Sequence, residues 1–206
     1  MSMNASAAEQ AGKRERTKAA NREAILAAAR RVFAQLGYEA ATVRDIIRGT
    51  DLASGTFYNY FRSKEEVFEA LADDGAQRFK PLLRAAREQA ASFEDYLHNS
   101  FVAYFRFLEQ EHGEEGRPVE ERQPHIRTDT PGMLAVYEEV RLGLEEAIAH
   151  GDVPRVDADY LANACIGVGQ EVGAAMLRRS PCDVEGAAAF AAGLILKGVA
   201  GAPRSG

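Results

Sequence analysis

The segment that most constrains the fold is residues 42–66, TVRDIIRGTDLASGTFYNYFRSKEE, which predicts two short helices and the start of a third. Thr42 is a favourable N-cap, and Asp45 three residues later completes a capping box for the first helix. That helix is expected to stop near residues 49–51, where Asp51 can adopt the left-handed conformation that ends a helix. The sequence therefore predicts a helix, a tight turn and a second helix.

The second helix is very short and is predicted from about Ser54 to Tyr60. Phe57 and Phe61 lie four residues apart and share its inner face. The remaining side chains are uncharged and form hydrogen bonds: Ser54, Thr56, Tyr58, Asn59 and Tyr60. Such a face suits phosphate oxygens and base edges in a DNA major groove. A glycine at a helix start is costly unless the backbone approaches a partner closely, so Gly55 is expected to lie against a thymine methyl or a phosphate.

Ser63 predicts the next helix start, with a glutamate completing its capping box. The free N–H groups there, together with Lys64, are expected to clamp a phosphate. The residues expected to contact DNA are Thr42, Arg44, Ser54, Gly55, Thr56, Tyr58, Asn59, Tyr60 and Lys64. Phosphates are expected mainly at Thr42, Tyr58, Tyr60 and Lys64, and bases at Ser54, Gly55, Thr56 and Asn59.

Over residues 21–71 the chain resembles the TetR family of bacterial transcriptional regulators. The matching positions are Ile25, Leu26, Ala29, Phe33, Gly37, Tyr38, Thr42, residues 54–61 (SGTFYNYF) and residues 63–65 (SKE). Two positions depart from the family pattern: Asp51 stands where the family generally has Gly, and Ala53 where it generally has Ser or Thr. Ala53 removes a cap worth about 1 kcal/mol, unless Ser54 caps a helix that starts one residue later.

The charge is unevenly distributed along the chain. Residues 1–64 carry 11 Lys or Arg against 6 Asp or Glu, a net charge of +5, whereas residues 65–206 carry 14 against 25, a net charge of −11. A basic N-terminal third on an acidic body is what a DNA-binding head on a soluble body requires. Two cysteines in apolar surroundings fit a reducing cytoplasm without a disulfide framework. No run is long and apolar enough to span a membrane, and the N-terminus has no signal-peptide pattern.

We expect an all-α fold of about nine helices, because no strand pattern competes anywhere. The predicted divisions are a disordered arm at 1–17, a helix-turn-helix domain at 18–64, a ligand-binding and dimerisation domain at 65–200 and a flexible tail at 201–206. A charged connection broken by Gly and Pro is expected at 112–124. The basic cluster at 13–18 has two open interpretations, a contact with DNA or a solubilising tail.

The last two long helices are rich in glycine and alanine, which allow close helix–helix approach. The family resemblance implies that these helices form the interface of a homodimer. Tight packing within one subunit is the alternative. A symmetric dimer would read the two half-sites of a palindromic operator in double-stranded DNA, about one helical turn apart.

The resemblance also implies a small-molecule pocket in the body. Its expected lining is Phe101, Tyr104, Phe105, Leu108, Met133, Tyr137, Asn163 and Gln170. Apolar walls with a few amide or hydroxyl groups fit a mainly apolar or aromatic effector. The alternative is that these aromatic residues simply fill the core.

Catalysis is not expected, because the four histidines are scattered without metal-ligand spacing and there is no phosphate-binding glycine loop. We therefore predict no catalytic residue, metal or cofactor. The predicted function is a cytoplasmic homodimeric repressor released from its operator by a small ligand. The alternatives are a DNA-binding activator or a regulator gated by a protein partner, and a helical ligand-binding protein without DNA binding.

Overall fold

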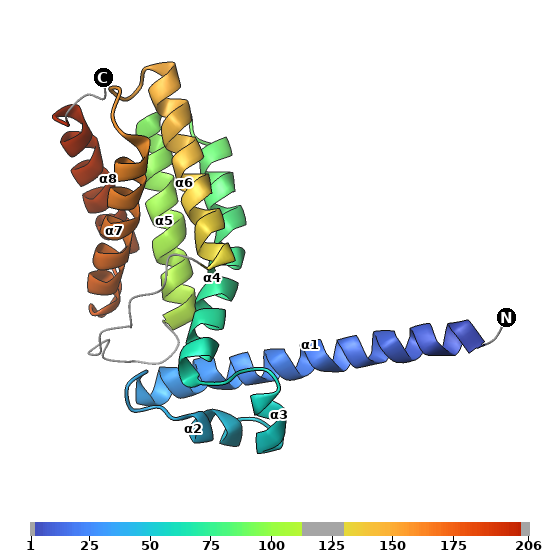
Figure 1. Cartoon of the computed structure of the whole chain (residues 1–206). Coiled ribbons are helices and arrows are strands. Elements are labelled where there is room, and N and C mark those ends of the chain that lie inside the picture. Colours follow the sequence, from blue (N-terminus) through green and yellow to red (C-terminus); the bar gives the residue numbers. More distant parts are fainter. Residues whose placement is uncertain (1–2, 113–129, 203–206) are drawn as a thin grey trace. The chain divides into compact units, whose positions relative to one another are not determined.

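A computed structural model describes residues 3–112 and 130–202 of the protein. The described residues form eight helices and no strand (Figure 1), so the predicted all-α fold is confirmed, with eight helices observed where about nine were expected. The described residues divide into two compact units at Ala72 and Asp73, which we call the head unit and the body unit. The predicted connection lies outside the described residues after residue 112, as does the predicted tail after residue 202.

The head unit contains α1 (Met3–Leu36), α2 (Val43–Arg48), α3 (Ser54–Tyr58) and the start of α4 (Lys64–Glu88). The sequence predicted a disordered arm to residue 17, but α1 is helical from Met3. The residues of this stretch include many strong helix formers (Ala, Glu, Gln, Lys and Arg) and no proline, so local propensity favours the helix. Helix α1 ends before Gly37, which adopts a φ of 77° that other residues rarely tolerate.

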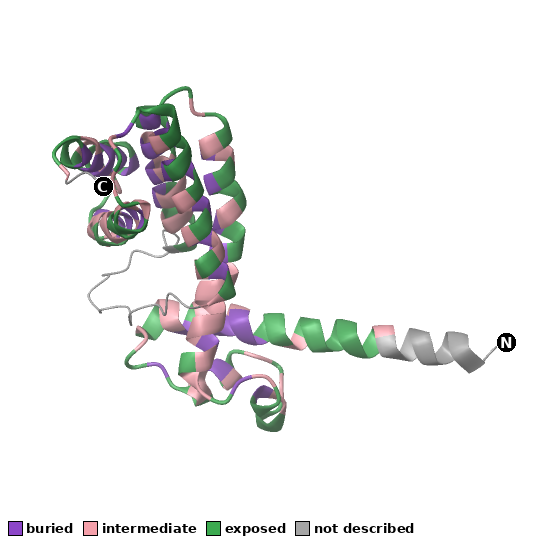
Figure 2. Ribbon diagram, turned by 45° about the horizontal axis from the view of Figure 1, so that its top comes forward, coloured by how far each residue is buried: buried purple, intermediate pink, exposed green. Residues whose placement is uncertain are grey.

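Buried apolar side chains from all four helices form the core of the head unit (Figure 2). Its buried members are Ile25, Leu26, Ala28, Ala29, Val32, Ala41, Ile46, Phe57, Phe61 and Val67. Burying a large apolar side chain contributes roughly 1.5–3 kcal/mol. The two phenylalanines therefore hold the short α3 in place, although a helix of this length is not stable by itself.

The turn between α2 and α3 differs from the prediction at Asp51. No residue other than glycine has a positive φ in the described chain, so the expected left-handed Asp51 is wrong. Thr50 closes the turn instead: its hydroxyl donates to the carbonyl of Ile47 at 2.8 Å and accepts from the N–H of Leu52 at 3.2 Å. This side chain satisfies the turn without a strained backbone.

The body unit contains the rest of α4 together with α5 (Phe93–His112), α6 (Pro131–His150), α7 (Ala158–Leu177) and α8 (Val184–Ala200). Helix α5 packs against α7 and α8, and α6 packs against α7. Three of these helices have side-chain caps: Thr130, Asp157 and Asp183 each accept a backbone N–H at the start of their helices. Helix α6 ends at Gly151, whose φ is 84°.

The large core of the body unit lies between α5, α6, α7 and α8. Cys165 is buried in this core, and burial raises the pKa of its thiol to about 12. Among the described helices, none is both long and apolar enough to cross a membrane.

Candidate nucleic-acid interface

Helix α3 has a polar face exposed to solvent and an aromatic face buried in the head core. Phe57 and Phe61 face the core, at 1% and 4% exposure, and their rings lie 6.2 Å apart. The residues of α3 and its cap that remain exposed are Ser54, Gly55, Tyr58 and Asn59, while Thr56 and Tyr60 are half-buried. An uncharged hydrogen-bonding surface is therefore displayed to solvent, as the sequence predicted.

The start of α3 has no side-chain cap. Its N-cap is Ala53, and α3 begins at Ser54, so the alternative in which Ser54 caps a later helix is wrong. An added Cβ at Gly55 would meet no atom within 4 Å. Packing within the subunit thus gives no reason for glycine at this position.

Helix α2 begins with the predicted capping box. The hydroxyl of Thr42 accepts from the N–H of Asp45 at 3.3 Å, and the Asp45 carboxylate accepts from the N–H of Thr42 at 3.1 Å. Hydrogen bonds from the hydroxyl and the backbone of Thr42 lower the pKa of Asp45. Thr42 and Arg44 are both exposed at this end of α2.

Lys64 occupies a different place from the one predicted. Its Nζ donates to the carbonyl oxygens of Tyr38, Glu39 and Ala41 at 2.9, 3.1 and 3.1 Å. The same ammonium lies 4.6 Å from the centre of the Tyr38 ring. An ammonium has three N–H donors, and all three are used here, so this geometry does not support a phosphate contact by Lys64.

Ser63 caps α4 as expected, since its hydroxyl accepts from the N–H of Glu66 at 3.3 Å. The carboxylate of Glu66 does not close the predicted box onto Ser63, because it accepts from the N–H of Arg62 instead. Nearby, the hydroxyl of Tyr38 donates to Glu65 at 3.2 Å, and burial together with the charge of Glu65 raises the pKa of Tyr38 to about 12.

The predicted ligand residues of the body unit are only partly brought together. Four of them lie on α5: Phe101, Tyr104, Phe105 and Leu108. Phe101 and Phe105 stack at 5.9 Å, and all four α5 residues lie against α7 at Gly169 or Gly173. Close approach of α7 at these two glycines leaves no room for a Cβ at Gly173, where Leu108 would lie 2.6 Å away.

The other predicted lining residues lie elsewhere. Met133 packs in a second, smaller cluster around Phe79, together with Tyr104. The hydroxyl of Tyr137 donates to Asp159 at 2.9 Å, and Asn163 donates to the carbonyl of Asp159 at 2.8 Å. Asn163 and Gln170 are exposed, so their amides do not face the apolar interior.

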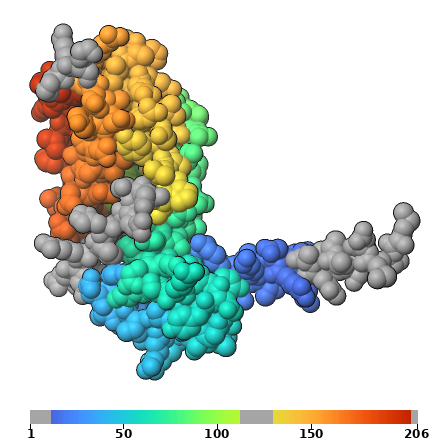
Figure 3. Space-filling view, in the orientation of Figure 1, coloured from blue at the N-terminus to red at the C-terminus, as the bar shows by residue number. Residues whose placement is uncertain are grey.

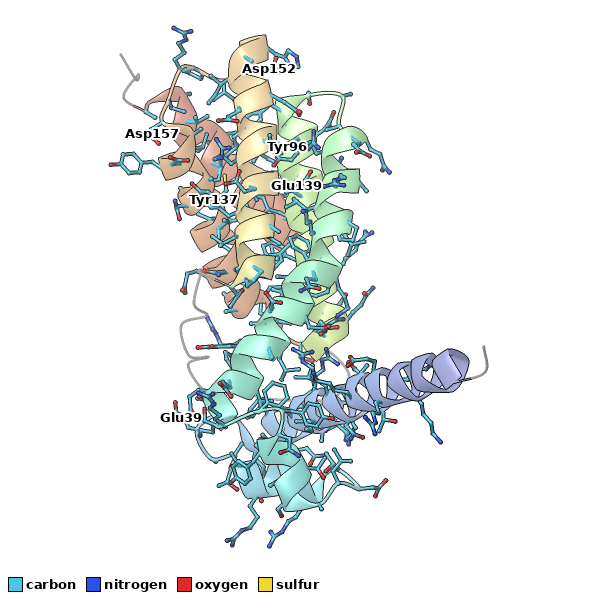
Figure 4. All side chains as sticks on the ribbon, turned by 45° about the vertical axis from the view of Figure 1, so that its right-hand side comes forward. Glu39, Tyr96, Tyr137, Glu139, Asp152 and Asp157 are labelled. Carbon is cyan, nitrogen blue, oxygen red and sulfur yellow. The ribbon has the colours of Figure 1, made fainter. Side chains whose placement is uncertain are left out.

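The body unit also buries one carboxylate that the sequence analysis missed. Glu139 on α6 (labelled in Figure 4) is 2% exposed. Its carboxylate accepts from Arg84 at 3.2 Å and from Arg87 at 3.0 Å. Burial raises the pKa of Glu139, but the hydrogen bonds from the two arginines outweigh it and lower the pKa. The sequence does contain a signal for this burial, because Glu139 falls at helical spacing between the apolar residues Val136 and Leu144 on the buried face of α6.

Two further polar groups lie inside the body unit. The hydroxyl of Tyr96 donates to the carbonyl of Val140 at 3.3 Å. The hydroxyl of Ser100, which is shielded from solvent, has no hydrogen-bond partner among the described residues. Within residues 3–112 and 130–202, no group of three or more His, Cys, Asp or Glu could hold a metal ion.

Comparison with known proteins supports the assignment of the head unit. Residues 25–71 match the family described as bacterial regulatory proteins, tetR family. The chain is 45% identical over 58 residues to the HTH-type transcriptional repressor AcnR of Corynebacterium efficiens, covering 28% of this chain and 31% of AcnR. It is 31% identical over 96 residues to the HTH-type transcriptional repressor KstR2 of Mycolicibacterium smegmatis, covering 47% of each. The chain thus spans less than half the length of these curated relatives.

The likeness of fold extends further than the likeness of sequence. The transcriptional regulator FadR from Bacillus subtilis, solved in complex with stearoyl-CoA, superimposes with a TM-score of 0.69 at 20% identity. The match covers 86% of this chain and 98% of FadR. With its helix-turn-helix geometry and the matching segment at residues 25–71, the head unit carries the conserved segment of the bacterial regulatory proteins of the tetR family.

Proposed function

We propose that this protein is a sequence-specific DNA-binding transcriptional repressor that works as a homodimer in the cytoplasm. The observation that carries the proposal is the orientation of α3. Its aromatic side chain Phe57 is buried in the head core, while its uncharged hydrogen-bonding side chains face solvent. A helix of this kind fits a major groove, where hydroxyl and amide groups read base edges. The relatives AcnR and KstR2 are transcriptional repressors, which supports a regulatory and not an enzymatic role.

Each DNA contact has an assigned role in the proposal. Phosphates are held by Thr42, Arg44, Tyr58 and Tyr60, and bases are approached by Ser54, Gly55, Thr56 and Asn59. Lys64 is left out of the proposed contacts, because its three donors are occupied by backbone carbonyls.

The dimer is supported by the exposed faces of α7 and α8. Three large apolar side chains on these helices are exposed: Tyr160, Phe190 and Leu194, at 78%, 63% and 50%. An added Cβ at Gly167, Gly193 or Gly198 would meet no atom within 4 Å. Packing within the subunit therefore does not explain these glycines, whereas Gly169 and Gly173 do pack against α5. Exposed apolar and small residues on two adjacent helices fit an interface with a second copy.

The release signal in the proposal is a small, mainly apolar ligand bound in the body unit. The proposed walls are the apolar side chains around Phe101, Tyr104 and Phe105, and the proposed polar group is the hydroxyl of Ser100, which has no hydrogen-bond partner among the described residues. FadR, which has the same fold, was solved with stearoyl-CoA, so the fold accommodates a long apolar ligand. Only a ligand that prefers one of two conformations could change the DNA affinity.

Band-shift titration of the protein against the DNA upstream of its own gene tests this function. Tyr58→Phe is expected to weaken binding to all sequences, because it removes a phosphate contact. Asn59→Ala is expected to change which base is preferred, because it removes a base contact. The proposal is wrong if the wild-type protein does not bind this DNA at low salt, or if both substitutions leave affinity and preference unchanged.

A further inference from the structure

A second feature of the head unit lies outside the helix-turn-helix. An open hollow of about 460 Å³ is formed between α1 and the segment that follows α3. It is lined by Lys13, Arg14, Thr17, Lys18 and Tyr60. All five residues belong to the head unit, and the N-terminal part of α1 projects away from the core of that unit (dark blue in Figure 3). The extension of α1 that the sequence analysis did not predict therefore forms one wall of this hollow.

The lining is strongly basic and carries no carboxylate. Lys13, Arg14 and Lys18 are exposed, and none of them forms an ion pair with a described residue. Arg14 and Lys18 lie four residues apart on α1, where like charges destabilise a helix. Three exposed cations around one hollow attract an anion.

Tyr60 lines the same hollow and carries a hydroxyl group. Its hydroxyl oxygen accepts from the side-chain amide of Asn21 on α1 at 3.3 Å. A phenol oxygen that accepts one hydrogen bond still has its own proton to donate. No described residue accepts that proton. Thr17 adds no donor, because its hydroxyl donates to the carbonyl of Lys13 at 3.0 Å.

The basic line continues along α1 beyond the hollow. Arg22 lies four residues after Lys18, and its guanidinium lies 5.7 Å from the centre of the Phe61 ring. Four residues of a helix span about 6 Å, so these cations are spaced along an extended line and do not converge on one point. An extended row of exposed cations fits a polymer of phosphates better than a single small anion.

We propose that Lys13, Arg14 and Lys18 of α1, together with the hydroxyl of Tyr60, form a second contact site for the phosphate backbone of duplex DNA. The inference rests on the proposed DNA-binding function and adds a contact surface that lies beside α3. Because the contacts go to phosphates, the site raises affinity without adding base preference. Tyr60 joins the two surfaces, since it lies two residues after the end of α3 and is hydrogen-bonded to α1.

The test compares the salt dependence of binding to the upstream DNA for wild type and for the triple variant Lys13→Gln, Arg14→Gln, Lys18→Gln. Binding is followed by fluorescence anisotropy from about 50 to about 200 mM salt, where each lost phosphate contact reduces the slope of log affinity against log salt by about 0.9. We expect the slope of the triple variant to fall by about 2 to 3. Tyr60→Phe is expected to weaken binding with little change in slope, because a neutral donor releases no counterion.

The matched control is Arg16→Gln. Arg16 lies on the same stretch of α1, is exposed and does not line the hollow. Arg16→Gln therefore removes the same charge as Lys18→Gln, but outside the hollow. We expect Lys18→Gln to reduce the slope by about 0.9 and Arg16→Gln by less than half of that. Helical circular dichroism and thermal unfolding of the variants verify that α1 remains folded.

Each remaining outcome counts for or against the site. If the wild type binds the DNA and the triple variant has the same slope and affinity, the α1 site is refuted while the proposed function stands. Equal effects of Lys18→Gln and Arg16→Gln would also refute it, because general charge and not the hollow would then explain the slope. A third outcome is that inorganic phosphate at constant ionic strength protects the wild type against unfolding, while the triple variant loses this protection but keeps its DNA affinity. The hollow would then bind free phosphate and not DNA. Failure of the wild type to bind any upstream DNA would overturn both the function and the site.

Discussion

The guanidinium of Arg87 donates from Nε and Nη2 to one carboxylate oxygen of Glu139, at 3.1 and 3.0 Å. Arg84 donates to the other oxygen at 3.2 and 3.3 Å, so both oxygens of this buried carboxylate are satisfied by α4. The pairing joins two helices of the body unit that are separated by more than 50 residues of sequence. Removing either partner of such a pair leaves an uncompensated charge in the protein, which destabilises the fold.

Glu139→Ala is expected to lower the free energy of unfolding by about 3 kcal/mol, the lower end of the range for a broken buried pair, because Arg84 remains half exposed to solvent. Chemical denaturation measures this change. Glu138→Ala on the same helix removes an exposed carboxylate bound to Arg141, so its effect should stay within about 1 kcal/mol. Equal losses from the two variants would contradict the role of burial.

Acid is expected to destabilise the body unit through the same carboxylate. The pKa of Glu139 is lower in the folded protein than its ordinary value of 4.5, so its contribution is complete above that value. The contribution is lost as the pH falls through the lowered pKa, when the folded state must take up a proton. Unfolding measured between about pH 3 and pH 6 should show a shallower acid slope for Glu139→Gln than for wild type. An unchanged slope would show that Glu139 does not titrate with unfolding.

Lys64→Met is expected to destabilise the protein by about 1–3 kcal/mol, because three carbonyl oxygens lose their donor. The slope of DNA affinity against salt should stay within about 0.3 of the wild-type value, since no phosphate contact is removed. Lys80→Met in the body unit serves as the comparison for stability. A reduction of the slope by about 0.9 would instead show that Lys64 contacts a phosphate in the complex with DNA.

Gly55→Ala separates stability from DNA binding. The position has open space, and alanine favours a helix, so the free energy of unfolding should be unchanged or raised by up to about 1 kcal/mol. DNA affinity should fall roughly tenfold, equivalent to about 1.4 kcal/mol, because the new methyl group prevents close backbone approach. Gly75→Ala, which meets only one atom at 3.9 Å, should leave DNA affinity unchanged. If Gly55→Ala binds DNA as the wild type does, close approach at this position is not required.

Phe190→Asp is expected to convert the proposed dimer into a monomer, because it places a charge on the exposed apolar face of α8. Sedimentation velocity measures the change, and affinity for a palindromic DNA should fall with it, since a monomer reads one half-site. Leu134→Asp changes a side chain of comparable exposure on α6 and should leave the dimer intact. A wild-type protein that sediments as a monomer at micromolar concentration would disprove the interface.

The boundaries of most helices could be predicted from the sequence, because their signals are local. Thr42, Thr130 and Asp157 cap their helices through atoms within three residues, and Gly151 ends α6 by its own backbone conformation. The exposed face of α3 was predictable for the same reason, since Phe57 fixes which side is buried.

The interactions that were missed depend on residues far apart in the sequence. Lys64 carries a helix-start pattern that fits a phosphate clamp, but carbonyls more than 20 residues earlier take up its donors. The partners of Glu139 lie 52 and 55 residues away, so periodicity alone identifies the buried carboxylate but not its arginines. Asp51 was mispredicted because a neighbouring threonine hydroxyl supplied the turn.

Because Cys165 is buried, the rate at which an alkylating reagent modifies its thiol reports how often the body unit opens. A thiol with a pKa near 12 is almost entirely protonated at neutral pH, and alkylating reagents react with the thiolate. The reagent therefore meets a reactive sulfur at this position only in molecules whose body helices have separated. Since Cys182 is only half-buried, the two cysteines record motions of different amplitude in one labelling time course.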